Sequence, residues 1–356
     1  MKKYLSAFFV IAMGVAALSA SAQRSDRKPL AKPEADGIWL RPAQGEAAQP
    51  IWGFVDGIRV GIAPLGGPRG LLRIYTPYMG QPDMRLINFM AIEPIPAGDI
   101  HRGLSELEHS KLDDRQGKRF WSSDDSLAVE PLDPTRPARG VVSTIDGEQA
   151  LTVYIFSEPF DNGAKVYVRL RFYASRPHEF EMATFARNDS KPLRNCILTA
   201  TMGNWARLRN LYLRKGEMKV STDLWPDYTD IHFAPHDTTA VDQMIRDRRK
   251  RTVYFIAAPN EMDAVNVTYD PKTTSGWFYQ GDRGTQYWYK VNPDPELIGL
   301  VNGRYCYWAG QAPIPGGIAY ENFELVEPFK QGATFVFGIA PMAPEVMIKK
   351  IKAREF

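Results

Sequence analysis

The segment Ala164–Ala174 constrains the fold more than any other part of this chain, because its apolar and polar residues alternate strictly. In an extended chain, its apolar residues fall on one side, and its lysine, arginine and tyrosine residues fall on the other. This period of two is typical of a β-strand with one buried and one solvated face. The apolar side consists of Val166, Val168, Leu170 and Phe172.

The run Leu151–Phe156 lies just before this segment and is also strand-like. Between the two stands Asn162-Gly163, a dipeptide that favours tight hairpin turns, so we expect the two strands to pair antiparallel. Proline and glycine punctuate similar runs along the rest of the chain, which is typical of a sandwich or barrel. These further runs are Glu179–Phe185, Cys196–Thr201, Thr252–Ala258, Gln286–Val291, Arg304–Trp308 and Thr334–Ile339.

The sequence therefore predicts a mostly β protein, a large antiparallel β-sandwich with one short helix. We expect the helix over Thr239–Arg249, where a threonine can cap the N-terminus and Val241, Met244 and Ile245 form an apolar stripe. The basic run Arg246–Arg251 at its end is interpreted as a solvated face that the helix dipole favours.

Residues 1–22 have the features of a secretory signal peptide, with a basic start, an apolar run from Tyr4 to Leu18 and small residues before Gln23. The apolar run is shorter than the ~20 residues that a membrane-spanning helix needs. We therefore expect an exported protein, periplasmic or secreted, with no membrane insertion after cleavage. Residues 23–36 predict a flexible leader, and residues 37–356, which show no linker or repeat, predict a single β-sandwich domain.

Charge and motifs exclude several classes of function. With 44 Lys and Arg residues against 41 Asp and Glu residues, the chain has no strong field for a nucleic-acid partner. The sequence has no P-loop, no dinucleotide-binding glycine motif, no zinc-protease motif and no serine nucleophile elbow. The two cysteines, Cys196 and Cys306, fit either a disulfide in an oxidising compartment or two buried thiols.

Two further segments each contain two strands joined by a turn. Gly57–Tyr75 has a Pro-Leu-Gly-Gly turn between its strands, and Ala319–Ile339 has a strand with glutamates, a glycine turn and a final strand. Both resemble the opening and closing strands of the large β-sandwich, or supersandwich, of galactose-mutarotase-like carbohydrate proteins. The resemblance implies this fold and a glycan ligand. The catalytic histidines of mutarotases have no clear counterpart here, so sugar epimerisation is not implied.

The segment Gly103–Asp114 is the densest acidic cluster of the chain. If it is extended, Glu106 and Glu108 share one face, and paired carboxyl groups can serve as acid and base in glycoside hydrolysis. The same pair could hold Ca²⁺ together with Asp113 or Asp114. An exposed acidic strand edge without a role is the remaining alternative.

A second acidic cluster is Tyr320–Glu324. In a regular strand Glu321 and Glu324 point to opposite faces, so one of them is expected to be buried. A buried carboxyl group either has a raised pKa or binds an arginine. It is then a candidate general acid or base, and a structural Glu–Arg pair is the alternative.

Other side chains are candidates for contacts with a sugar, because aromatic faces stack on the C–H faces of sugar rings. Core packing is the alternative for the aromatic residues. His232 and His236 lie in a stretch rich in Pro and Asp and are candidates for a base, or for a zinc site whose third ligand is not identified. The candidate substrate-binding residues are Trp288, Arg304, Tyr305, Tyr307, Trp308 and Asn322.

Together these features predict a secreted carbohydrate-active enzyme that acts on an oligo- or polysaccharide. The first hypothesis is a glycoside hydrolase with paired carboxyl groups. A polysaccharide lyase that acts on a uronic-acid glycan by β-elimination is the second, with Tyr or His as base and Arg or Asn to neutralise the uronate. A non-catalytic glycan-binding or envelope protein is the third. No cofactor is expected, apart from a Ca²⁺ ion that the acidic clusters could hold. The carboxyl groups come from Glu106, Glu108, Glu321 and Glu324.

Overall fold

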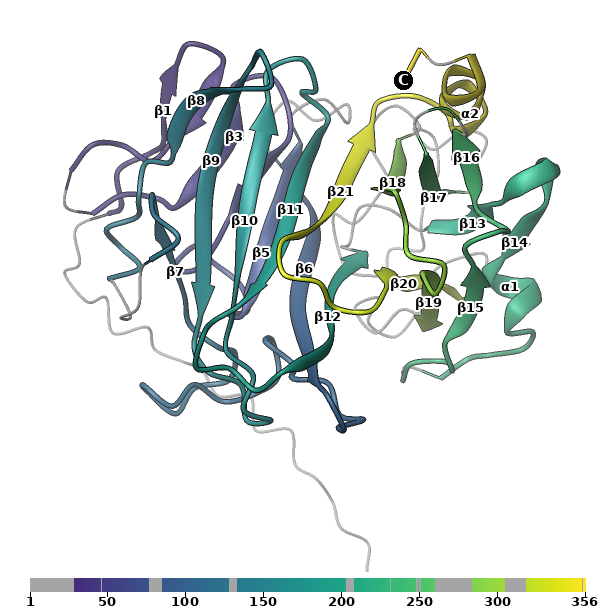
Figure 1. The fold of residues 1–356 in the computed structure, drawn as a ribbon, viewed down its shortest axis with the longest axis horizontal. Helices are drawn as coiled ribbons and strands as arrows, with labels where there is room; N and C mark the ends of the chain where they lie inside the picture. Colours follow the sequence, from purple (N-terminus) through teal and green to yellow (C-terminus); the bar gives the residue numbers. More distant parts are fainter. Residues whose placement is uncertain are drawn as a thin grey trace, which may run out of the picture.

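Two large antiparallel sheets form a β-sandwich, as the sequence predicts (Figure 1). The computed structural model describes residues 29–45, 47–76, 85–127, 133–202, 208–230, 232–247, 249, 251–259, 284–304, 318–353 and 355–356. The predicted signal peptide lies outside these residues. Within them, no helix is both long and apolar enough to cross a membrane.

The first sheet has ten strands. In spatial order they are β1 (Glu34–Asp36), β2 (Trp39–Arg41), β3 (Ile51–Phe54), β4 (Arg59–Gly61), β5 (Leu71–Thr76), β6 (Arg85–Pro96), β12 (Leu193–Met202), β20 (Ala319–Val326), β19 (Ile298–Arg304) and β15 (Asp237–Ala240). The last three residues of the predicted flexible leader thus form strand β1, which pairs with β2.

The second sheet has eleven strands. Nine of them follow one another as β14 (Met218–Val220), β13 (Leu208–Tyr212), β17 (Thr252–Pro259), β18 (Thr285–Val291), β21 (Ala333–Ala340), β11 (Glu179–Ala186), β10 (Val166–Tyr173), β9 (Glu148–Ser157) and β7 (Phe120–Ser123). In addition, β16 (Ile245–Asp247) pairs with β17, and β8 (Val141–Ile145) pairs with β9. In Figure 1, β9, β10 and β11 lie in front of β3, β5 and β6.

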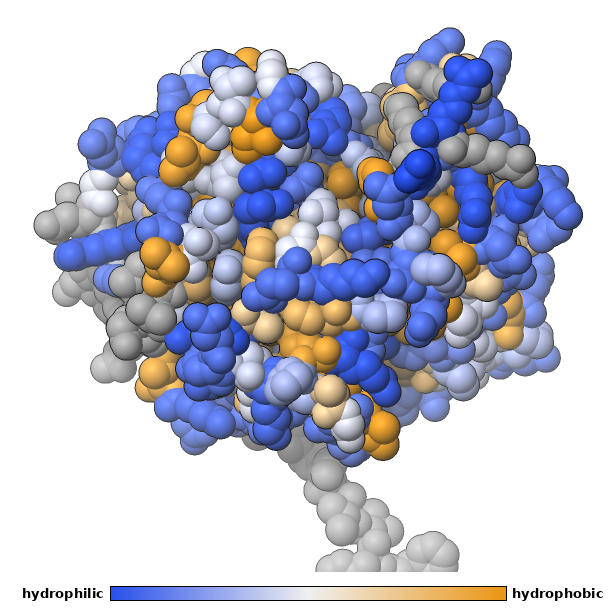
Figure 2. Space-filling model, viewed as in Figure 1, coloured by the Kyte–Doolittle hydropathy of each residue, from blue (hydrophilic) through white to orange (hydrophobic). Residues whose placement is uncertain are grey.

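The core lies between the two sheets, and strand β10 confirms the alternation on which the prediction depends. Its residues alternate between buried and half-buried along the whole strand. The four buried ones have no exposed surface, and each side chain of this kind contributes about 1.5–3 kcal/mol when it leaves water. The other side of this sheet faces solvent, and Figure 2 shows hydrophilic and hydrophobic side chains mixed over it.

The predicted hairpin is also confirmed. Strands β9 and β10 pair antiparallel, with Phe156 opposite Tyr167 and Leu151 opposite Phe172. Gly163 in the connection has a φ of +88°, in the left-handed region that glycine adopts without strain. Five of the other predicted strands correspond to β11, β12, β17, β18 and β21. Of the predicted strand Arg304–Trp308, only Arg304 is described, as the last residue of β19, and residues 305–308 lie outside the described part.

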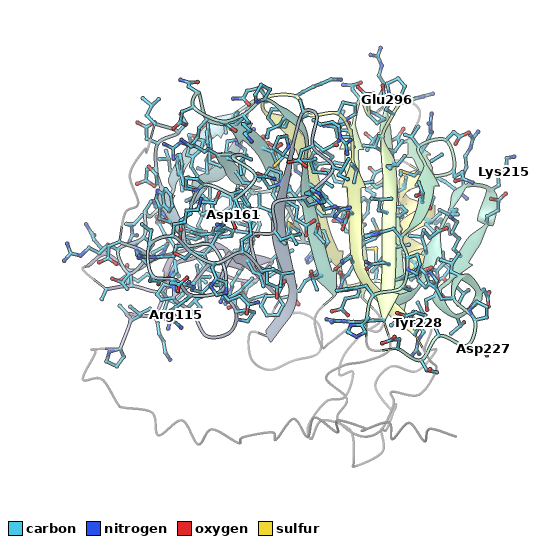
Figure 3. The ribbon with its side chains drawn as sticks, turned by 90° about the horizontal axis from the view of Figure 1, so that it is seen from below. Arg115, Asp161, Lys215, Asp227, Tyr228 and Glu296 are labelled. Carbon is cyan, nitrogen blue, oxygen red and sulfur yellow. The ribbon has the colours of Figure 1, made fainter. Side chains whose placement is uncertain are left out.

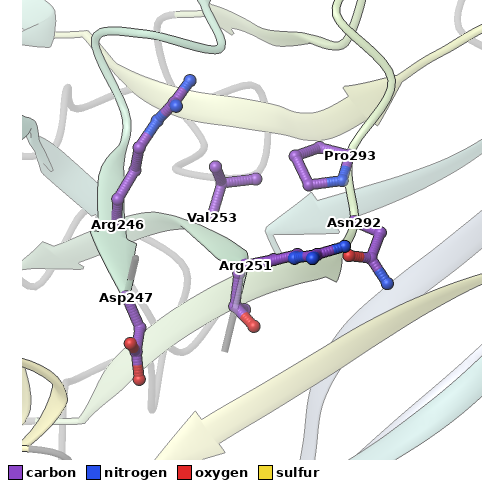
Figure 4. A pocket seen from close by; sticks show the side chains of 7 residues that line it. Arg246, Asp247, Arg251, Val253, Asn292 and Pro293 are labelled. Carbon is purple, nitrogen blue, oxygen red and sulfur yellow. The ribbon is translucent and has the colours of Figure 1, made fainter. Parts of the chain in front are cut away.

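The predicted helix over Thr239–Arg249 is wrong, because the chain crosses there from β15 in one sheet to β16 in the other. Met244 is buried in the core between the sheets, whereas Ile245 is buried in a separate apolar cluster. The apolar stripe is therefore divided between two clusters, and sheet pairing prevails over a weak helical preference. Arg246 of the basic run lies in β16, and Arg249 and Arg251 lie in the turn before β17, so no helix dipole favours them; Figure 4 shows Arg246 and Arg251 pointing in different directions.

Two α-helices form elsewhere, the short α1 (Ser221–Leu224) and α2 (Pro344–Ala353), together with the 3₁₀ turn η1 (Arg214–Gly216). In α2 a proline stands at the first position, and Met347 and Ile351, four residues apart, are buried on one face. These two residues belong to the apolar cluster on which α2 packs beside β16 and β17. Cys196 is a buried free thiol, and Cys306 lies outside the described residues.

Candidate active site

Acidic side chains gather on the outer face of the ten-stranded sheet, away from the core. Glu93 lies on β6, and Glu321 and Glu324 lie on β20, with β12 between the two strands. Residues that alternate with them, such as Ile92 and Phe323, pack in the core. None of the three glutamates is more than 8% exposed, so their carboxyl groups depend on protein partners.

A β-bulge in β20 places Glu321 and Glu324 on the same face. The register between β19 and β20 skips Glu321, which has no opposite residue on β19. The extra residue shifts the alternation, so that Tyr320 and Phe323 both face the core although two residues separate them. The expectation that the two glutamates lie on opposite faces is therefore wrong. Both are buried, and each binds an arginine.

Arg102, from the loop after β6, joins two of these carboxylates. Its Nη1 donates to Oε2 of Glu93 at 2.7 Å and to both oxygens of Glu324 at 3.0 Å. Thr199 of β12 donates its hydroxyl to Oε1 of Glu324 at 3.2 Å. Two buried carboxyl groups thus share one guanidinium, which is one positive charge too few to neutralise both.

The two carboxyl groups that share Arg102 titrate differently. Burial and the adjacent Glu324 charge raise the pKa of Glu93 to about 7, against the opposing charge of Arg102. Burial also acts to raise the pKa of Glu324, but the neighbouring His236 and Arg102 outweigh it and bring this pKa below its usual range. Near neutral pH, Glu93 therefore exchanges a proton while Glu324 stays ionised.

A second group consists of Glu321, Arg304 and Glu106. Arg304 donates from Nη2 to Oε1 of Glu321 at 2.7 Å. Burial raises the pKa of Glu321 and Arg304 opposes this, while the charge of Glu106 raises it further. Burial also raises the pKa of the half-buried Glu106, again against Arg304. Two carboxyl groups with raised pKa values therefore lie beside one guanidinium.

The loop that leads into β15 adds an aromatic ring to this group. The backbone N–H of Ala234 donates to the carbonyl of Gly303 at 2.7 Å, which docks the loop on β19. The centroid of the Phe233 ring lies 4.6 Å from Cζ of Arg304, and Phe233 is 47% exposed. An exposed aromatic face beside a carboxyl pair can stack on the C–H face of a sugar ring.

His236, in the same loop, links the two groups. Its Nε2 lies 3.3 Å from Nδ2 of Asn302 and 3.9 Å from Oε1 of Glu324. The backbone N–H of Asn322 donates to Oδ1 of Asn302 at 3.2 Å. Of the residues that the sequence predicts, the structure thus brings together Glu106, His236, Arg304, Glu321, Asn322 and Glu324.

His232 lies apart from this cluster and is exposed. Its carbonyl accepts the hydroxyl of Tyr228 at 2.7 Å, and its N–H donates to Asp230 at 2.9 Å. Figure 3 shows Tyr228 and Asp227 at the edge of the molecule. Among the described residues, neither His232 nor His236 belongs to a group of side chains that could hold a metal ion, so the arrangement does not support a zinc site that uses both.

The segment around Glu106 and Glu108 is a turn, so the extended strand on which their pairing would depend does not form. The N–H of Glu108 donates to the carbonyl of Leu104, and the Glu108 carboxylate accepts the N–H groups of Leu104 at 3.0 Å and Asp161 at 2.8 Å. Nζ of Lys118 lies 3.0 Å from the same carboxylate. Glu108 therefore holds the loop together, and Glu106 alone interacts with the cluster.

The aspartates proposed as Ca²⁺ ligands have other partners. Asp113 forms an ion pair with Arg69 at 2.6 Å, and Asp114 lies 3.5 Å from His109. Across the part of the chain that the structure describes, no group of three or more His, Cys, Asp or Glu side chains is arranged to hold a metal ion.

Trp288 is buried between the sheets rather than at the site. Its Nε1 donates to the carbonyl of Phe323 at 2.9 Å, and its ring contacts Phe337 edge-on. At 1% exposure it packs in the core, where no substrate can contact it. The other aromatic candidates, Tyr305, Tyr307 and Trp308, lie outside the described residues.

Sequence reasoning missed three members of the cluster. Glu93 had a usable signal, because it is the only charged residue in the apolar run from Leu86 to Pro96. Arg102 and Phe233 lie in loops without a pattern, and only the packing of those loops on the sheet brings them to the glutamates.

Comparison with known proteins gives a distant structural likeness only. No family model matches this chain, and no curated protein matches it. Among solved structures, the chain is similar to an inverting mannosidase of family GH92 from Bacteroides thetaiotaomicron, with a TM-score of 0.24 and 8% sequence identity. The likeness covers 89% of this chain and 29% of the mannosidase chain. At this TM-score it carries no argument about the site.

Proposed function

We propose that this chain is an exported enzyme that hydrolyses glycosidic bonds, with Glu106 and Glu321 as its catalytic carboxyl pair. The observation that carries the proposal is the presence of two carboxyl groups with raised pKa values beside one guanidinium, that of Arg304. Glycoside hydrolysis needs one carboxyl group that protonates the leaving oxygen. It needs a second, ionised one that activates water or attacks the sugar.

The surroundings of the two carboxyl groups distinguish their roles. Glu321 accepts a hydrogen bond from Arg304, which favours its ionised form and the role of base or nucleophile. Glu106 is half-buried, and the described residues provide no hydrogen bond to its carboxyl group. A carboxyl group whose pKa is raised by burial and which has no fixed partner suits the role of general acid.

The ligand in this proposal is an oligo- or polysaccharide. Phe233 offers an exposed ring on which a sugar can stack, and the half-buried Asn322 of β20 offers a side-chain amide group. The signal-peptide features of residues 1–22 support export to the periplasm or beyond, where such polymers are met.

Charge favours hydrolysis over elimination. A lyase must neutralise the carboxylate of a uronic acid, but here four glutamates surround only two arginines, Arg102 and Arg304. Both arginines already pair with glutamates of the cluster, which leaves no separate cation to neutralise a uronate. The contact between His236 and Asn302 favours the second candidate, a lyase, in which these two residues would serve as base and neutraliser.

The test uses the chain from Gln23 onward and a panel of plant, algal and bacterial glycans. New reducing ends and the ultraviolet absorbance of a 4,5-unsaturated uronate are followed in parallel. We expect reducing ends without absorbance, and a loss of about 10²–10⁴-fold in kcat for Glu106→Gln and for Glu321→Gln. Glu327→Gln is the matched control, because Glu327 is also a buried glutamate in an ion pair, with Lys290.

Other outcomes would contradict the proposal in distinct ways. Full activity in both variants would remove the two glutamates from catalysis. Absorbance that is lost in His236→Ala would indicate a lyase. Unchanged glycans together with binding that the two variants retain would indicate a non-catalytic glycan-binding protein.

A further inference from the structure

The outer side of the eleven-stranded sheet has a cavity of its own, beside the C-terminal helix α2. Its volume is about 790 Å³, within the range of small-molecule sites. The lining comes from the loop before β11, from strands β11, β17 and β18, from the end of β21 and from the chain after α2. It shares no residue with the glutamate cluster, which lies on the other sheet.

Aromatic rings form one wall of this cavity. Tyr254 and Tyr289 are opposite each other on β17 and β18, with ring centroids 5.3 Å apart. The rings of Tyr287 and Tyr289 are nearly parallel, with an interplanar angle of 7° and centroids 6.4 Å apart. The ring of Phe356 stands edge-on to Tyr287 at 5.3 Å. The three tyrosines are at most 9% exposed, so the half-buried Phe356 offers the ring face that a ring-shaped ligand can contact.

A buried carboxylate orders the polar atoms of the cavity. Glu179 accepts the hydroxyl protons of Tyr287 and of Tyr289, each at 2.8 Å. Because both protons point to Glu179, neither hydroxyl has a proton left to donate to a ligand. Arg176 donates to the oxygen of Tyr289 at 3.2 Å, and Lys350 provides a further donor in the lining.

The charges of the lining cancel. Nη1 of Arg176 lies 3.5 Å from Oε1 of Glu179, so the two charges offset each other. Lys350 and Glu355, which also line the cavity, have opposite charges. Burial lowers the pKa of His178, so this imidazole is neutral at pH 7. The charged side chains of the lining therefore balance one another, and the lining offers apolar surface together with donors.

We propose that this cavity binds a neutral sugar residue of a glycan, as a non-catalytic site separate from the glutamate cluster. A pyranose has the matching features, namely apolar C–H faces and hydroxyl groups that both donate and accept. The choice of a sugar over another neutral ring rests on the proposed function. The site would hold a polymer on the enzyme while the other sheet face acts on it.

The test measures binding by calorimetry with the full mature chain carrying Glu106→Gln and Glu321→Gln, so that nothing is cleaved. The probes are cellohexaose, mannohexaose and xylohexaose. In this background we expect Arg176→Gln to weaken binding about tenfold, since it removes a charged donor. Phe356→Ala removes a ring without touching the sheet and is expected to weaken binding several-fold. Arg171→Gln is the matched control, because Arg171 lies near Tyr173 on the same sheet but outside the cavity.

Several outcomes would overturn the proposal. These are no heat with any of the three hexasaccharides at millimolar concentration, unchanged affinity in both Arg176→Gln and Phe356→Ala, or tighter binding of a hexauronate than of the neutral probes. Cleavage of a short soluble substrate by the otherwise wild-type enzyme should not change in Arg176→Gln. If Glu106→Gln and Glu321→Gln keep full activity while Arg176→Gln still weakens binding, the proposed catalytic pair fails and the cavity site stands.

Discussion

The outer faces of the two sheets each bury a glutamate beside an arginine, but they satisfy its charge in different ways. On the ten-stranded sheet, Glu324 shares Arg102 with Glu93, so that two carboxyl groups have one cation. On the eleven-stranded sheet, Glu179 has Arg176 to itself and two tyrosine hydroxyls as well. The first arrangement lacks positive charge and exchanges protons near neutral pH. The second pairs one carboxyl group with one cation and two hydroxyl donors, although burial raises the pKa of Glu179 as well.

Removing the arginine should affect the two faces very differently. Arg102→Met leaves Glu93 and Glu324 buried without a cation, and we expect it to lower the free energy of unfolding by about 3–5 kcal/mol. Arg176→Met leaves Glu179 with its two tyrosine donors, and we expect a loss of about 1 kcal/mol. Urea unfolding of both variants at pH 7 measures the difference.

The double variant Glu93→Gln/Arg102→Met tests the cause of the larger effect. It removes one of the two competing charges together with the cation, so it should recover part of the stability that Arg102→Met loses. Equal losses in Arg102→Met and Arg176→Met would mean that the sharing of one arginine has no energetic consequence, and the contrast between the two faces would fail.

The pH dependence of stability should reveal the shifted group on the acidic face. The folded-state pKa of Glu93, about 7, lies above its unfolded value, so the folded protein holds this proton more tightly. Relative to Glu93→Gln, the wild type should therefore lose stability as pH rises from about 4 to 7, by about 3 kcal/mol in total. Above pH 7 the difference should level off.

The control for this titration is Glu148→Gln, at a carboxylate whose pKa is lowered. Hydrogen bonds from Ser175 stabilise the ionised Glu148, so its contribution is present above its unfolded pKa and is lost as pH falls. The difference in the free energy of unfolding between the wild type and this variant should stay constant between pH 6 and 8. A flat difference for Glu93→Gln in the same range would show that Glu93 does not hold a proton near neutrality.

The sequence predicts the elements of this fold better than it predicts the site, for a physical reason. Strand β10 is visible because its burial repeats every two residues, and Asn162-Gly163 marks its hairpin because the turn requires a left-handed residue. Helix α2 also carries local signals, a proline at its first position and buried Met347 and Ile351, which a closer reading could have used. These features depend on neighbours along the chain.

The site depends instead on neighbours in space. The bulge at Glu321 reverses the predicted face of one glutamate, and no pattern in the neighbouring sequence predicts this bulge. Arg102 reaches Glu324 across 222 positions of sequence, and Phe233 reaches Arg304 from a loop docked by one backbone hydrogen bond. The sequence indicated that buried glutamates need arginines, but only the packing of loops on the sheet decides which arginines they are.

The last comparison concerns a tyrosine hydroxyl on the outer side of the eleven-stranded sheet. Tyr287→Phe removes a hydroxyl that donates to the buried carboxylate of Glu179, and we expect a loss of about 2 kcal/mol, as for a hydrogen bond to a charged group. Tyr320→Phe is the matched control, because the Tyr320 hydroxyl donates to the neutral carbonyl of Lys219 at 3.1 Å. It should cost about 1 kcal/mol, as for a bond between neutral groups. Thermal and urea unfolding of the two variants compare these values.

If Tyr287→Phe costs no more than Tyr320→Phe while Arg176→Met costs several kcal/mol, the arginine alone compensates Glu179. The two sheet faces would then satisfy their buried glutamates in the same way.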